Sequence, residues 1–556
     1  MQQTERTPLA ALYHWEQSRP DRLHFTQPVG GGQVVSYTWA EAMTEARKLA
    51  AYLRSLNLPA GSQIALLGKN SAHWMIADWA IWMCGHVTVP IYPTLNADTV
   101  AYILEHSEAK LLIVGRLDDW QMMAAGVPDS LPMLRLPLAA DTRGEDWETA
   151  VAGLEPITDS PDRSLDDLAT IVYTSGSTGR PKGVMLNFRS FYLVGNLLND
   201  LFPVGEEDRM LSYLPLAHVA ERLVVENNSV YHGFQVFFAE SLETFVADLQ
   251  RARPTMFFSV PRLWTKFHLA VCDKLPLKKQ KVMFRIPVLG KKVKHKILTQ
   301  LGLGEARIGF TGAAPLPPAI LDWYRSLGLE LLEAYGMSEN CAYSHFTKPG
   351  DAKTGYVGTA NPGVECRIAE NGEILVKSPA QMLGYYKNPE ATAEAITEDG
   401  FFKTGDMGVL DEAGRLRITG RVKELFKTSK GKYVAPVPIE NKLGAHPAIE
   451  VVCVGGANQP ATLGLVLLSD ELRRQQAAGS LDKEALAAEL SALTQEVNST
   501  LDPHEQLQCL VVVPEVWGIE NGFLTPTMKI KRNVIEAHYE NRVEEWMGAR
   551  QTVIFA

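Results

Sequence analysis

The sequence predicts an α/β protein, with a large N-terminal domain of layered α/β subdomains and a small α+β domain at its C-terminal end. Two observations predict this class. Short apolar runs of strand length alternate with segments of helical periodicity, a pattern typical of largely parallel sheets covered by helices. The 556 residues are 46% hydrophobic and 21% charged, which is ordinary globular composition and enough chain for several domains. A disordered chain, a coiled coil and a collagen-like fibre are thereby excluded.

The alternating pattern is clearest in the first third of the chain. Thr38 and Glu41 have the spacing of a capping box, and apolar side chains follow at helical spacing, so a helix is predicted from residue 39. Short apolar runs predict buried strands at residues 63–68, 86–91, 111–114 and 170–173. Residues 116–162 show the least pattern, and we expect mostly loops there.

The most apolar stretch, residues 74–92, does not predict a membrane span. It is interrupted by Asp78, Gly85, His86 and Pro90. These residues favour a buried helix over residues 71–85 that leads into the strand at 86–91.

We place the domain boundary at Gly420-Arg-Val-Lys423, which divides the chain into domains of residues 1–420 and 421–556. Ahead of it, residues 411–414 predict a turn between two strands. Beyond it, the pattern changes to a hairpin, a strand and a long helix over residues 481–501. The last ~130 residues have a suitable size for a small α+β domain.

Charge and cysteine content restrict the classes of function. Lys plus Arg is 54 and Asp plus Glu is 64, so the net charge is −10, which argues against nucleic-acid binding. The six cysteines form no CxxC pair, so neither a zinc ribbon nor a disulfide scaffold is indicated. The N-terminal residues lead into no apolar run, and we expect no signal peptide. These features favour the cytoplasm. The sequence leaves the oligomeric state open, with a homodimer as one option.

The strongest local signal is the loop Tyr173-Thr-Ser-Gly-Ser-Thr-Gly-Arg-Pro-Lys-Gly183. It follows a predicted strand, and its glycine amides, hydroxyls and lysine suit the binding of phosphate oxygens. It does not match the P-loop pattern GxxxxGK[ST]. A flexible Ser/Gly linker is the alternative. The candidate nucleotide-binding residues are Thr174, Ser175, Gly176, Ser177, Thr178, Gly179 and Lys182.

Further motifs follow this loop in a fixed order. They are Gly312-Ala-Ala-Pro315, Glu333-Ala-Tyr-Gly-Met-Ser-Glu339, Thr404-Gly-Asp406, Gly420-Arg-Val-Lys423 and Pro526-Thr-Met-Lys529. Together they resemble the motifs of the adenylate-forming enzymes, which include acyl-CoA synthetases, luciferases and peptide-synthetase adenylation domains. The resemblance covers about residues 30 to 540. Leu214-Pro-Leu-Ala-His218 and Val260-Pro-Arg262 are most similar to the long-chain fatty acyl-CoA synthetases.

The resemblance implies a two-step reaction. A fatty acid, long-chain by the resemblance, attacks ATP to give acyl-AMP and pyrophosphate, and the thiol of CoA then displaces AMP. ATP, Mg²⁺ and CoA are the implied cofactors and co-substrates. Two alternatives stay open: an acyl-AMP ligase that passes the acyl group to a carrier protein, and an inactive relative that only binds acyl chains or nucleotide. Chain length and pathway are left open by the sequence.

Two residues are implied to be catalytic. Lys529 would bridge the incoming carboxylate and the α-phosphate, where negative charge accumulates. Glu339 would hold Mg²⁺ together with the hydroxyl of Thr174. The residues alone also allow blander roles. Lys529 could belong to a solvated basic triplet with Lys531 and Arg532, and Glu339 could be an ordinary solvated side chain.

The implied nucleotide site uses the middle motifs. Tyr335 would stack on adenine opposite Gly312 and Ala313, and Ser338 stands where the commoner YGxTE motif has Thr. Asp406 and Arg421 would bind the ribose or phosphate. A core tyrosine and a turn aspartate are the structural alternatives for Tyr335 and Asp406.

The remaining residues concern the second step. In the family the small domain is mobile, and it rotates at a hinge that corresponds to Lys423. That motion would bring the hairpin with Lys427 and Gly431 to CoA. His218 would line the acyl or pantetheine channel, or serve as a structural histidine.

Residues 274–296 are a local exception to the acidic charge, with nine basic side chains and no acidic one. Their spacing predicts two short amphipathic pieces separated at Pro287. Basic faces beside apolar stripes suit weak peripheral contact with an anionic membrane, here the inner surface of the cell membrane. The alternative is a solvated basic segment that packs on the protein through its apolar stripe.

Overall fold

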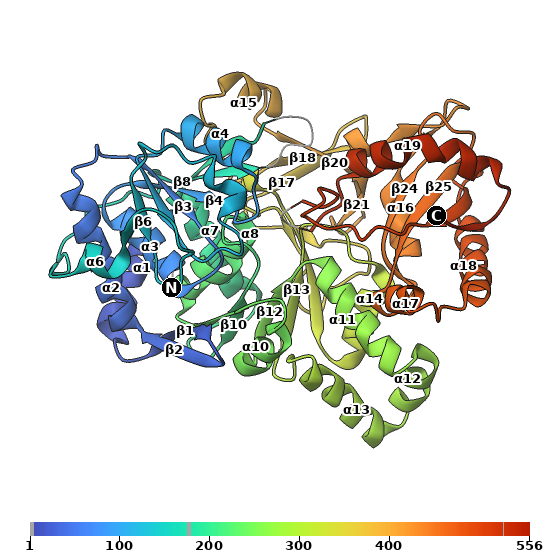
Figure 1. The fold of residues 1–556 in the computed structure, drawn as a ribbon, viewed down its shortest axis with the longest axis horizontal. Coiled ribbons are helices and arrows are strands. Elements are labelled where there is room, and N and C mark those ends of the chain that lie inside the picture. The colour runs from blue at the N-terminus through green and yellow to red at the C-terminus, as the bar shows by residue number, and fades with distance from the viewer. Residues whose placement is uncertain (1–4, 175–179, 526–527) are drawn as a thin grey trace.

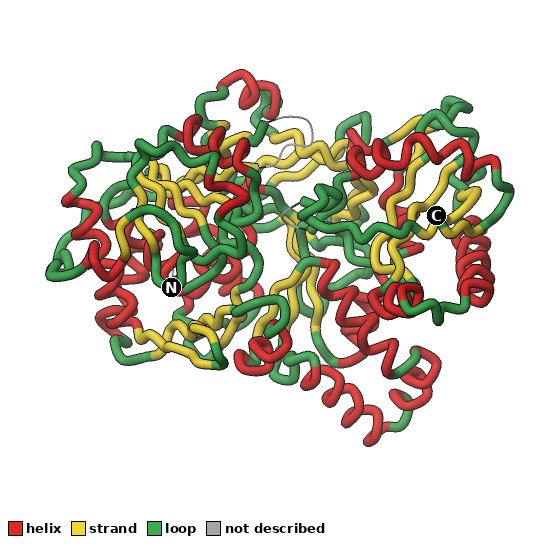
Figure 2. Tube along the Cα trace, in the orientation of Figure 1, coloured by secondary structure: helices red, strands yellow, loops and turns green. Residues whose placement is uncertain are grey.

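The computed structural model describes residues 5–174, 180–525 and 528–556, except for the side chain of Asp200. It confirms the α/β class, with a large N-terminal domain and a small C-terminal domain (Figure 1). Strands lie inside each domain and helices cover them (Figure 2).

The largest sheet contains the end of the predicted phosphate loop. Its central strands are parallel, whereas at one edge β9 runs antiparallel to its neighbour β8 and β19 runs antiparallel to β9. In sheet order its strands are β19 (Gly384–Tyr385), β9 (Lys182–Asn187), β8 (Leu168–Thr174), β4 (Val87–Ile91), β3 (Gln63–Leu67), β5 (Leu111–Val114), β6 (Met133–Arg135) and β7 (Glu145–Asp146).

Three further sheets complete the N-terminal domain. The first has the order β12 (Met256–Ser259), β13 (Ile308–Thr311), β14 (Glu330–Tyr335), β15 (His345–Phe346) and β16 (Thr359–Ala360). The second has β10 (Arg209–Ser212), β11 (Gln235–Phe238), β1 (Leu23–Gly30) and β2 (Gln33–Thr38). The third has β17 (Glu365–Ile368), β18 (Glu373–Lys377), β20 (Phe402–Leu410) and β21 (Leu416–Arg421).

Helices pack around these sheets. They are α1 (Pro8–Ser18), α2 (Trp39–Ser55), α3 (Ala72–Met83), α4 (Ala97–Ser107), α5 (Gln121–Ala124), α6 (Trp147–Val151), α7 (Phe188–Leu201), α8 (Val219–Glu221), the π-helix η1 (Arg222–Asn227), α9 (Asn228–His232), α10 (Phe245–Ala252), α11 (Pro261–Lys274), α12 (Leu277–Phe284), α13 (Pro287–Gln300), α14 (Pro318–Leu327), the 3₁₀ helix η2 (Ser338–Asn340) and α15 (Pro389–Ala395).

The C-terminal domain is built around one four-stranded sheet. Successive residues of β25 face two different hydrophobic clusters, so the sheet is covered on both sides and its strand is apolar throughout. The elements are the 3₁₀ helix η3 (Val422–Glu424), β22 (Phe426–Lys427), β23 (Tyr433–Val434), α16 (Pro436–Leu443), β24 (Ile449–Gly455), β25 (Thr462–Leu468), α17 (Asp470–Ala477), α18 (Lys483–Asn498), β26 (Leu507–Val512), α19 (Arg532–Gly548) and β27 (Val553–Phe555).

The elements predicted from residue patterns agree with the structure. The Thr38 side chain accepts a hydrogen bond from the Glu41 amide while Glu41 binds the Thr38 amide, so the predicted capping box is present at the start of α2. The four predicted strands correspond to β3, β4, β5 and β8. Residues 116–162 are mostly loops but include α5, β6, β7 and α6. Across the described residues, each helix is too short or too polar to traverse a bilayer.

A buried ionic network lies in the core of the N-terminal domain. Asp78, on α3, is fully buried and accepts a hydrogen bond from Arg222 Nε at 3.0 Å. Arg222 also donates to Thr170 Oγ1 at 2.7 Å and lies 3.6 Å from Glu226, one turn away on η1. Burial and the nearby Asp78 carboxylate raise the pKa of Glu226 well above its usual value. Asp78, which interrupts the apolar run of residues 74–92, is therefore the buried ion-pair partner of Arg222.

Candidate active site

The Glu333–Glu339 motif begins in β14 and ends in η2. Close backbone packing explains its glycine, because a Cβ on Gly336 would lie 2.6 Å from Ala342. Gly312, at the end of the neighbouring β13, has the same constraint, since its Cβ would lie 3.1 Å from the carbonyl oxygen of Ala334. Ala313 follows with a φ of 68°, in the left-handed region that favours glycine. The two motifs are thus held side by side by strand pairing.

Tyr335, Asp406 and Arg421 form a connected group. The Tyr335 hydroxyl donates to Asp406 Oδ2 at 2.8 Å, and Arg421 Nε lies 2.9 Å from Asp406 Oδ1. Asp406 and Arg421 are direct partners in the pairing of β20 and β21. Burial and the Asp406 charge raise the pKa of Tyr335 well above its usual value. The ring of Tyr335 also packs in a hydrophobic cluster, as expected for the alternative role of a core tyrosine.

Glu339 is held by a tyrosine that the sequence did not single out. The Tyr385 hydroxyl donates to Glu339 Oε1 at 2.9 Å. The ammonium of Lys182 lies 4.7 Å from the centre of the Tyr385 ring. The strands β8, β9 and β19 explain this contact, because Thr174 is paired with Lys182 and β19 pairs with β9. The predicted residues Ser175, Gly176, Ser177, Thr178 and Gly179 lie outside the described residues.

Lys529 lies close enough to this group to interact with its charges. Loss of hydration and the Arg421 charge lower the pKa of Lys529, whereas the carboxylates of Asp406, Glu424 and Glu339 act in the opposite direction. By surface area, however, Lys529 is exposed to solvent. The lysine of the C-terminal domain and the acidic residues of the N-terminal domain therefore meet at one place.

Hydrogen bonds to Thr525 hold the backbone amide and carbonyl of Lys529. The Thr525 amide donates to the Lys529 carbonyl at 2.8 Å, and the Lys529 amide donates to Thr525 Oγ1 at 3.1 Å. Three residues later, Arg532 is buried and donates to the Val454 carbonyl and to Glu440 Oε1, both at 2.7 Å. Arg532 is therefore an internal anchor, and the predicted alternative of a solvated basic triplet is wrong for this residue.

His218 faces the same region. Its Nδ1 accepts a hydrogen bond from the Ala220 amide at 3.1 Å and caps α8. Burial, with a smaller contribution from the Lys529 charge, lowers the pKa of His218 to about 3. The imidazole is therefore neutral at physiological pH. It has a structural capping role and also lies near Lys529.

The residues predicted for the hinge and for the hairpin that would reach CoA lie on the C-terminal domain. Lys423 is exposed and lies in η3. This helix follows directly after Arg421, the last residue of β21. Lys427 and Tyr433 pair in the short hairpin β22–β23, whose turn includes Gly431 with a φ of 77°. The Lys427 carbonyl accepts a hydrogen bond from the Asn458 amide at 2.9 Å, which ties the hairpin to its own domain.

An ionic cluster across the two domains was not predicted. Glu450 on β24 is buried, and its carboxylate lies 2.9 Å from Arg262 and 2.7 Å from Arg473. Lys266, on α11 of the N-terminal domain, lies 3.6 Å away. Burial alone would raise the pKa of Glu450, but the charges of Lys266, Arg262 and Arg473 outweigh it and lower the pKa. In the sequence, Arg262 was noted only as part of the Val260-Pro-Arg motif, and nothing in that motif indicated an ion pair with Glu450.

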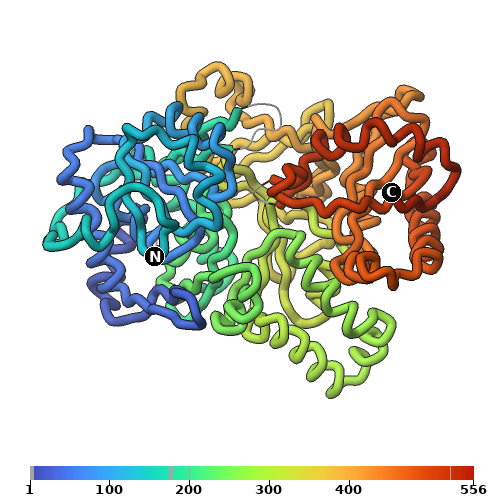
Figure 3. The backbone as a smooth tube through the Cα atoms, viewed as in Figure 1, coloured from blue at the N-terminus to red at the C-terminus, as the bar shows by residue number. Residues whose placement is uncertain are grey.

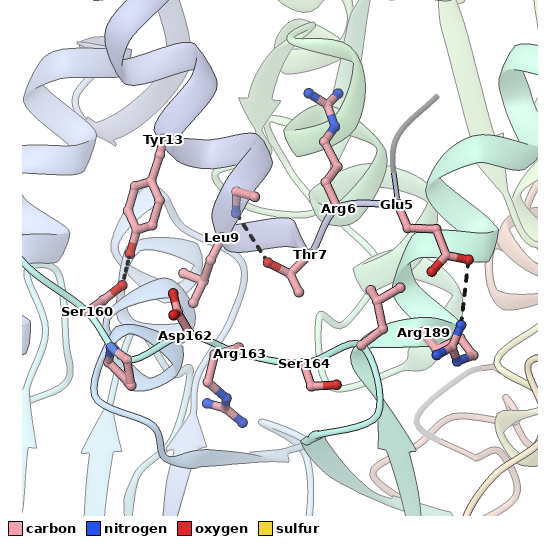
Figure 4. Close-up of a pocket in the computed structure, with 13 residues that line it drawn as sticks. Glu5, Arg6, Thr7, Leu9, Tyr13, Ser160, Asp162, Arg163, Ser164 and Arg189 are labelled. Carbon is pink, nitrogen blue, oxygen red and sulfur yellow. Dashed lines mark hydrogen bonds and ion pairs between the residues drawn. The ribbon is translucent and has the colours of Figure 1, made fainter. Parts of the chain in front are cut away.

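Two cavities lie outside the group around Lys529. The larger, about 580 Å³, is lined by Leu383, Tyr385 and Ile396 among others, and so adjoins the tyrosine that holds Glu339. The other, about 480 Å³, lies between α1 and residues 160–165, where Tyr13 and Ser160 share a hydrogen bond of 2.5 Å (Figure 4). Within the described parts of the chain, no three His, Cys, Asp or Glu side chains are grouped so that they could hold a metal ion.

Comparison with known families decides the classification. The AMP-binding enzyme family matches residues 12–386, and its C-terminal domain family matches residues 424–550. The chain belongs to the AMP-binding enzymes. This membership confirms the predicted adenylate-forming superfamily.

Named relatives of this AMP-binding enzyme are fatty-acid ligases. Long-chain-fatty-acid–CoA ligase FadD15 of Mycobacterium bovis is 32% identical, with 96% of each chain covered. Human long-chain-fatty-acid–CoA ligase 1 is 29% identical over 87% of this chain and 78% of its own. They support the predicted resemblance to long-chain acyl-CoA synthetases.

Solved structures agree with the fold. Anthranilate CoA ligase AuaEII in complex with anthranoyl-AMP superimposes with a TM-score of 0.81 at 19% identity, covering 97% of this chain and 98% of its own. ATP-bound MatB from Rhodopseudomonas palustris superimposes with a TM-score of 0.75 at 24% identity, covering 97% and 99%.

Proposed function

We propose that this AMP-binding enzyme activates a long-chain fatty acid with ATP to form acyl-AMP and pyrophosphate, and then transfers the acyl group to CoA. The proximity of Lys529 to Glu339, Asp406 and Arg421 supports the proposal, because a cation and the predicted nucleotide-binding groups come together there from two domains. The names of the relatives support the choice of fatty acid and CoA. All six cysteines are free, which supports the proposed cytoplasmic location.

In the first step, the proposed role of Lys529 is electrostatic. Its ammonium would lie between the fatty carboxylate and the α-phosphate and stabilise the charge that develops as the new bond forms. Asp406 and Arg421 would fix the ribose, and Tyr335, Gly312 and Ala313 would bound the adenine. A fatty carboxylate is already ionised at neutral pH, so no general base is required.

The residues at Glu339 fit a magnesium ion. One oxygen of Glu339 accepts the Tyr385 hydrogen bond, and the other oxygen accepts none from the described residues. A single carboxylate and the Thr174 hydroxyl match the preference of Mg²⁺ for few protein ligands beside phosphates and water. When bound, the ion would neutralise phosphate charge. Tyr385 would then keep the carboxylate oriented.

In the second step, a rotation at Lys423 would replace Lys529 by the hairpin with Lys427 and Gly431. Gly431 would let the pantetheine arm pass close to the backbone, since no side chain other than that of Lys427 lies within 4 Å of its Cβ position. The proximity of Lys529 to Asp406 and Glu339 in the structure supports its proposed role in the first step.

The Glu450 cluster would hold this first pose, because its partners lie on both domains. Glu450→Gln removes the negative charge between Arg262, Lys266 and Arg473. We expect the rate of acyl-AMP formation to fall at least about fivefold, while thioester formation from supplied acyl-AMP is unchanged. Single-turnover assays of the two half-reactions measure this.

The matched control is Glu545→Gln, because the ion-pair partner of Glu545 among the described residues is Arg542, on the same helix of the C-terminal domain. It should leave both half-reactions unchanged. Equal losses of both half-reactions in Glu450→Gln would contradict a pose-specific role for the cluster.

The proposed function itself is tested by ATP–pyrophosphate exchange with fatty acids of increasing chain length. We expect exchange that depends on the acid, is greatest with long chains, and requires Mg²⁺. Addition of CoA to the acyl-AMP formed should then release acyl-CoA. Exchange without thioester formation would favour the carrier-protein ligase, and no exchange with any acid would indicate the inactive relative.

A further inference from the structure

The helices α12 and α13 form a projection from the N-terminal domain, at the lower right of Figure 1 and Figure 3. Its base is anchored in the core. The buried Gln280 accepts a hydrogen bond from Trp323 Nε1 at 2.7 Å and donates to the Leu275 carbonyl at 2.6 Å. Ile297 and Leu298 are buried in the same hydrophobic cluster as Trp323. The predicted packing of the segment on the protein is therefore correct for its base.

The far end of the projection is different, because its aliphatic side chains face solvent. Val282 is 65% exposed and Val288 is 70% exposed, with Ile286 and Leu289 at 47% and 44%. They lie within eight successive residues around the turn between the helices. The turn is tightly packed, since a Cβ on Gly290 would lie 2.7 Å from the Phe284 carbonyl oxygen. The structure thus presents these four side chains, here called the apolar tip, on a fixed turn.

Nine basic side chains lie along the projection and at its junction with α11. They are Lys274, Lys278, Lys279, Lys281, Arg285, Lys291, Lys292, Lys294 and Lys296. All are exposed except Lys294, which is partly buried with its ammonium 5.2 Å from the centre of the Phe284 ring. None of the nine has an ion-pair partner among the described residues. With a net charge of −10 for the whole chain, the remainder is net −19, so the projection is a strong local exception.

We propose that the α12–α13 projection docks on the surface of an anionic lipid bilayer. An anionic surface complements nine unpaired basic groups, and the interfacial region of a bilayer accepts aliphatic side chains. Nucleic acid matches the charge but gives no burial site for the apolar tip. The bilayer is also the place where long acyl chains partition, so docking would bring the enzyme to a pool of its proposed substrate.

The test is co-sedimentation of the full-length protein with vesicles of phosphatidylcholine alone or phosphatidylcholine with phosphatidylglycerol. It is run at about 0.1 M and about 1 M salt, where the Debye length falls from about 10 Å to about 3 Å. The charge variant replaces five exposed basic residues by Gln at Lys278, Lys281, Arg285, Lys291 and Lys292. The tip variant replaces the apolar tip by Ser at Val282, Ile286, Val288 and Leu289. The control variant replaces five exposed basic residues elsewhere by Gln at Lys110, Lys348, Arg474, Lys483 and Arg550.

We expect the parent to bind only the anionic vesicles, to dissociate at the higher salt, and to lose at least tenfold in partition coefficient in both the charge and the tip variants. The control variant should bind as the parent does. Thermal unfolding checks that every variant is folded. Because the measured quantity is binding to vesicles, the test does not depend on catalysis. The proposal is overturned if the parent does not bind anionic vesicles, or if the charge variant binds as the parent does. A tip variant with parental binding would also overturn it, because the surface would then recognise charge alone, as for an acidic protein or nucleic acid.

Discussion

Replacement of Lys529 by alanine is expected to lower the rate of acyl-AMP formation about 10²–10³-fold, the usual cost of removing one group that stabilises developing charge. The reason is positional. Lys529 lies among the charges of Asp406, Glu424 and Glu339, where the carboxylate and the α-phosphate would meet. Thioester formation from supplied acyl-AMP should stay within a few-fold of the parent, because the Lys427 hairpin would face the site in that step. Acid-dependent ATP–pyrophosphate exchange and a single-turnover thioester assay measure the two rates.

Lys531→Ala is the matched control, since Lys531 is a lysine of the same segment and lies at the start of α19 rather than among these charges. It should leave both rates close to those of the parent. If Lys529→Ala lowered both half-reactions equally, the assignment of this lysine to the first step alone would be wrong.

Replacement of Arg222 by methionine is expected to lower the free energy of unfolding of the N-terminal domain by about 3–5 kcal/mol. The side chain of Arg222 is almost completely buried and is the cation between Asp78 and Glu226. Without it, an ionised Asp78 would be unpaired in the core. Its pKa would rise, and the folded state would then keep a proton that the unfolded state has released. The stability of the variant should therefore fall as the pH rises above about 4.

Chemical denaturation at several pH values measures both effects. Arg189→Met is the control, because Arg189 pairs with Asp166 on the surface with a Nε–Oδ1 distance of 2.9 Å. Its stability should stay close to that of the parent across the same pH range. An Arg222→Met variant as stable as the parent at neutral pH would show that the network gives no net stabilisation.

Local patterns predicted most of the fold because they depend on neighbouring residues. The capping box at Thr38 and the short apolar strands need only a few adjacent side chains to be recognised. Helical periodicity likewise predicted both pieces of residues 274–296. It did not reveal which apolar side chains would reach the core, since Ile297 is buried whereas Leu289, two turns earlier, is exposed. That choice depends on where the projection joins the domain.

The contacts that the sequence could not predict join residues far apart in the chain. Asp78 and Arg222 are separated by 144 positions, Arg262 and Glu450 by 188, and Glu339 and Tyr385 by 46. Each side chain alone resembles an ordinary polar residue, and only the topology of the sheets makes them partners. Motifs such as Thr404-Gly-Asp406 could be predicted because their residues are neighbours in the sequence. The roles of those residues stay predictions until the half-reactions are measured.

The hydrogen bonds between Thr525 and Lys529 and the buried Arg532 have a thermodynamic consequence. A lysine on a loose loop would lose backbone conformational entropy each time it entered the site, at about 1–2 kcal/mol per ordered residue. Here the Thr525 hydrogen bonds hold the amide and carbonyl groups of Lys529, and Arg532 anchors the chain three residues later. That entropy is lost once, during folding, and not in every catalytic cycle. Lys529 is therefore preorganised, and only the rotation of the whole domain and the flexible stem of one side chain remain to be ordered.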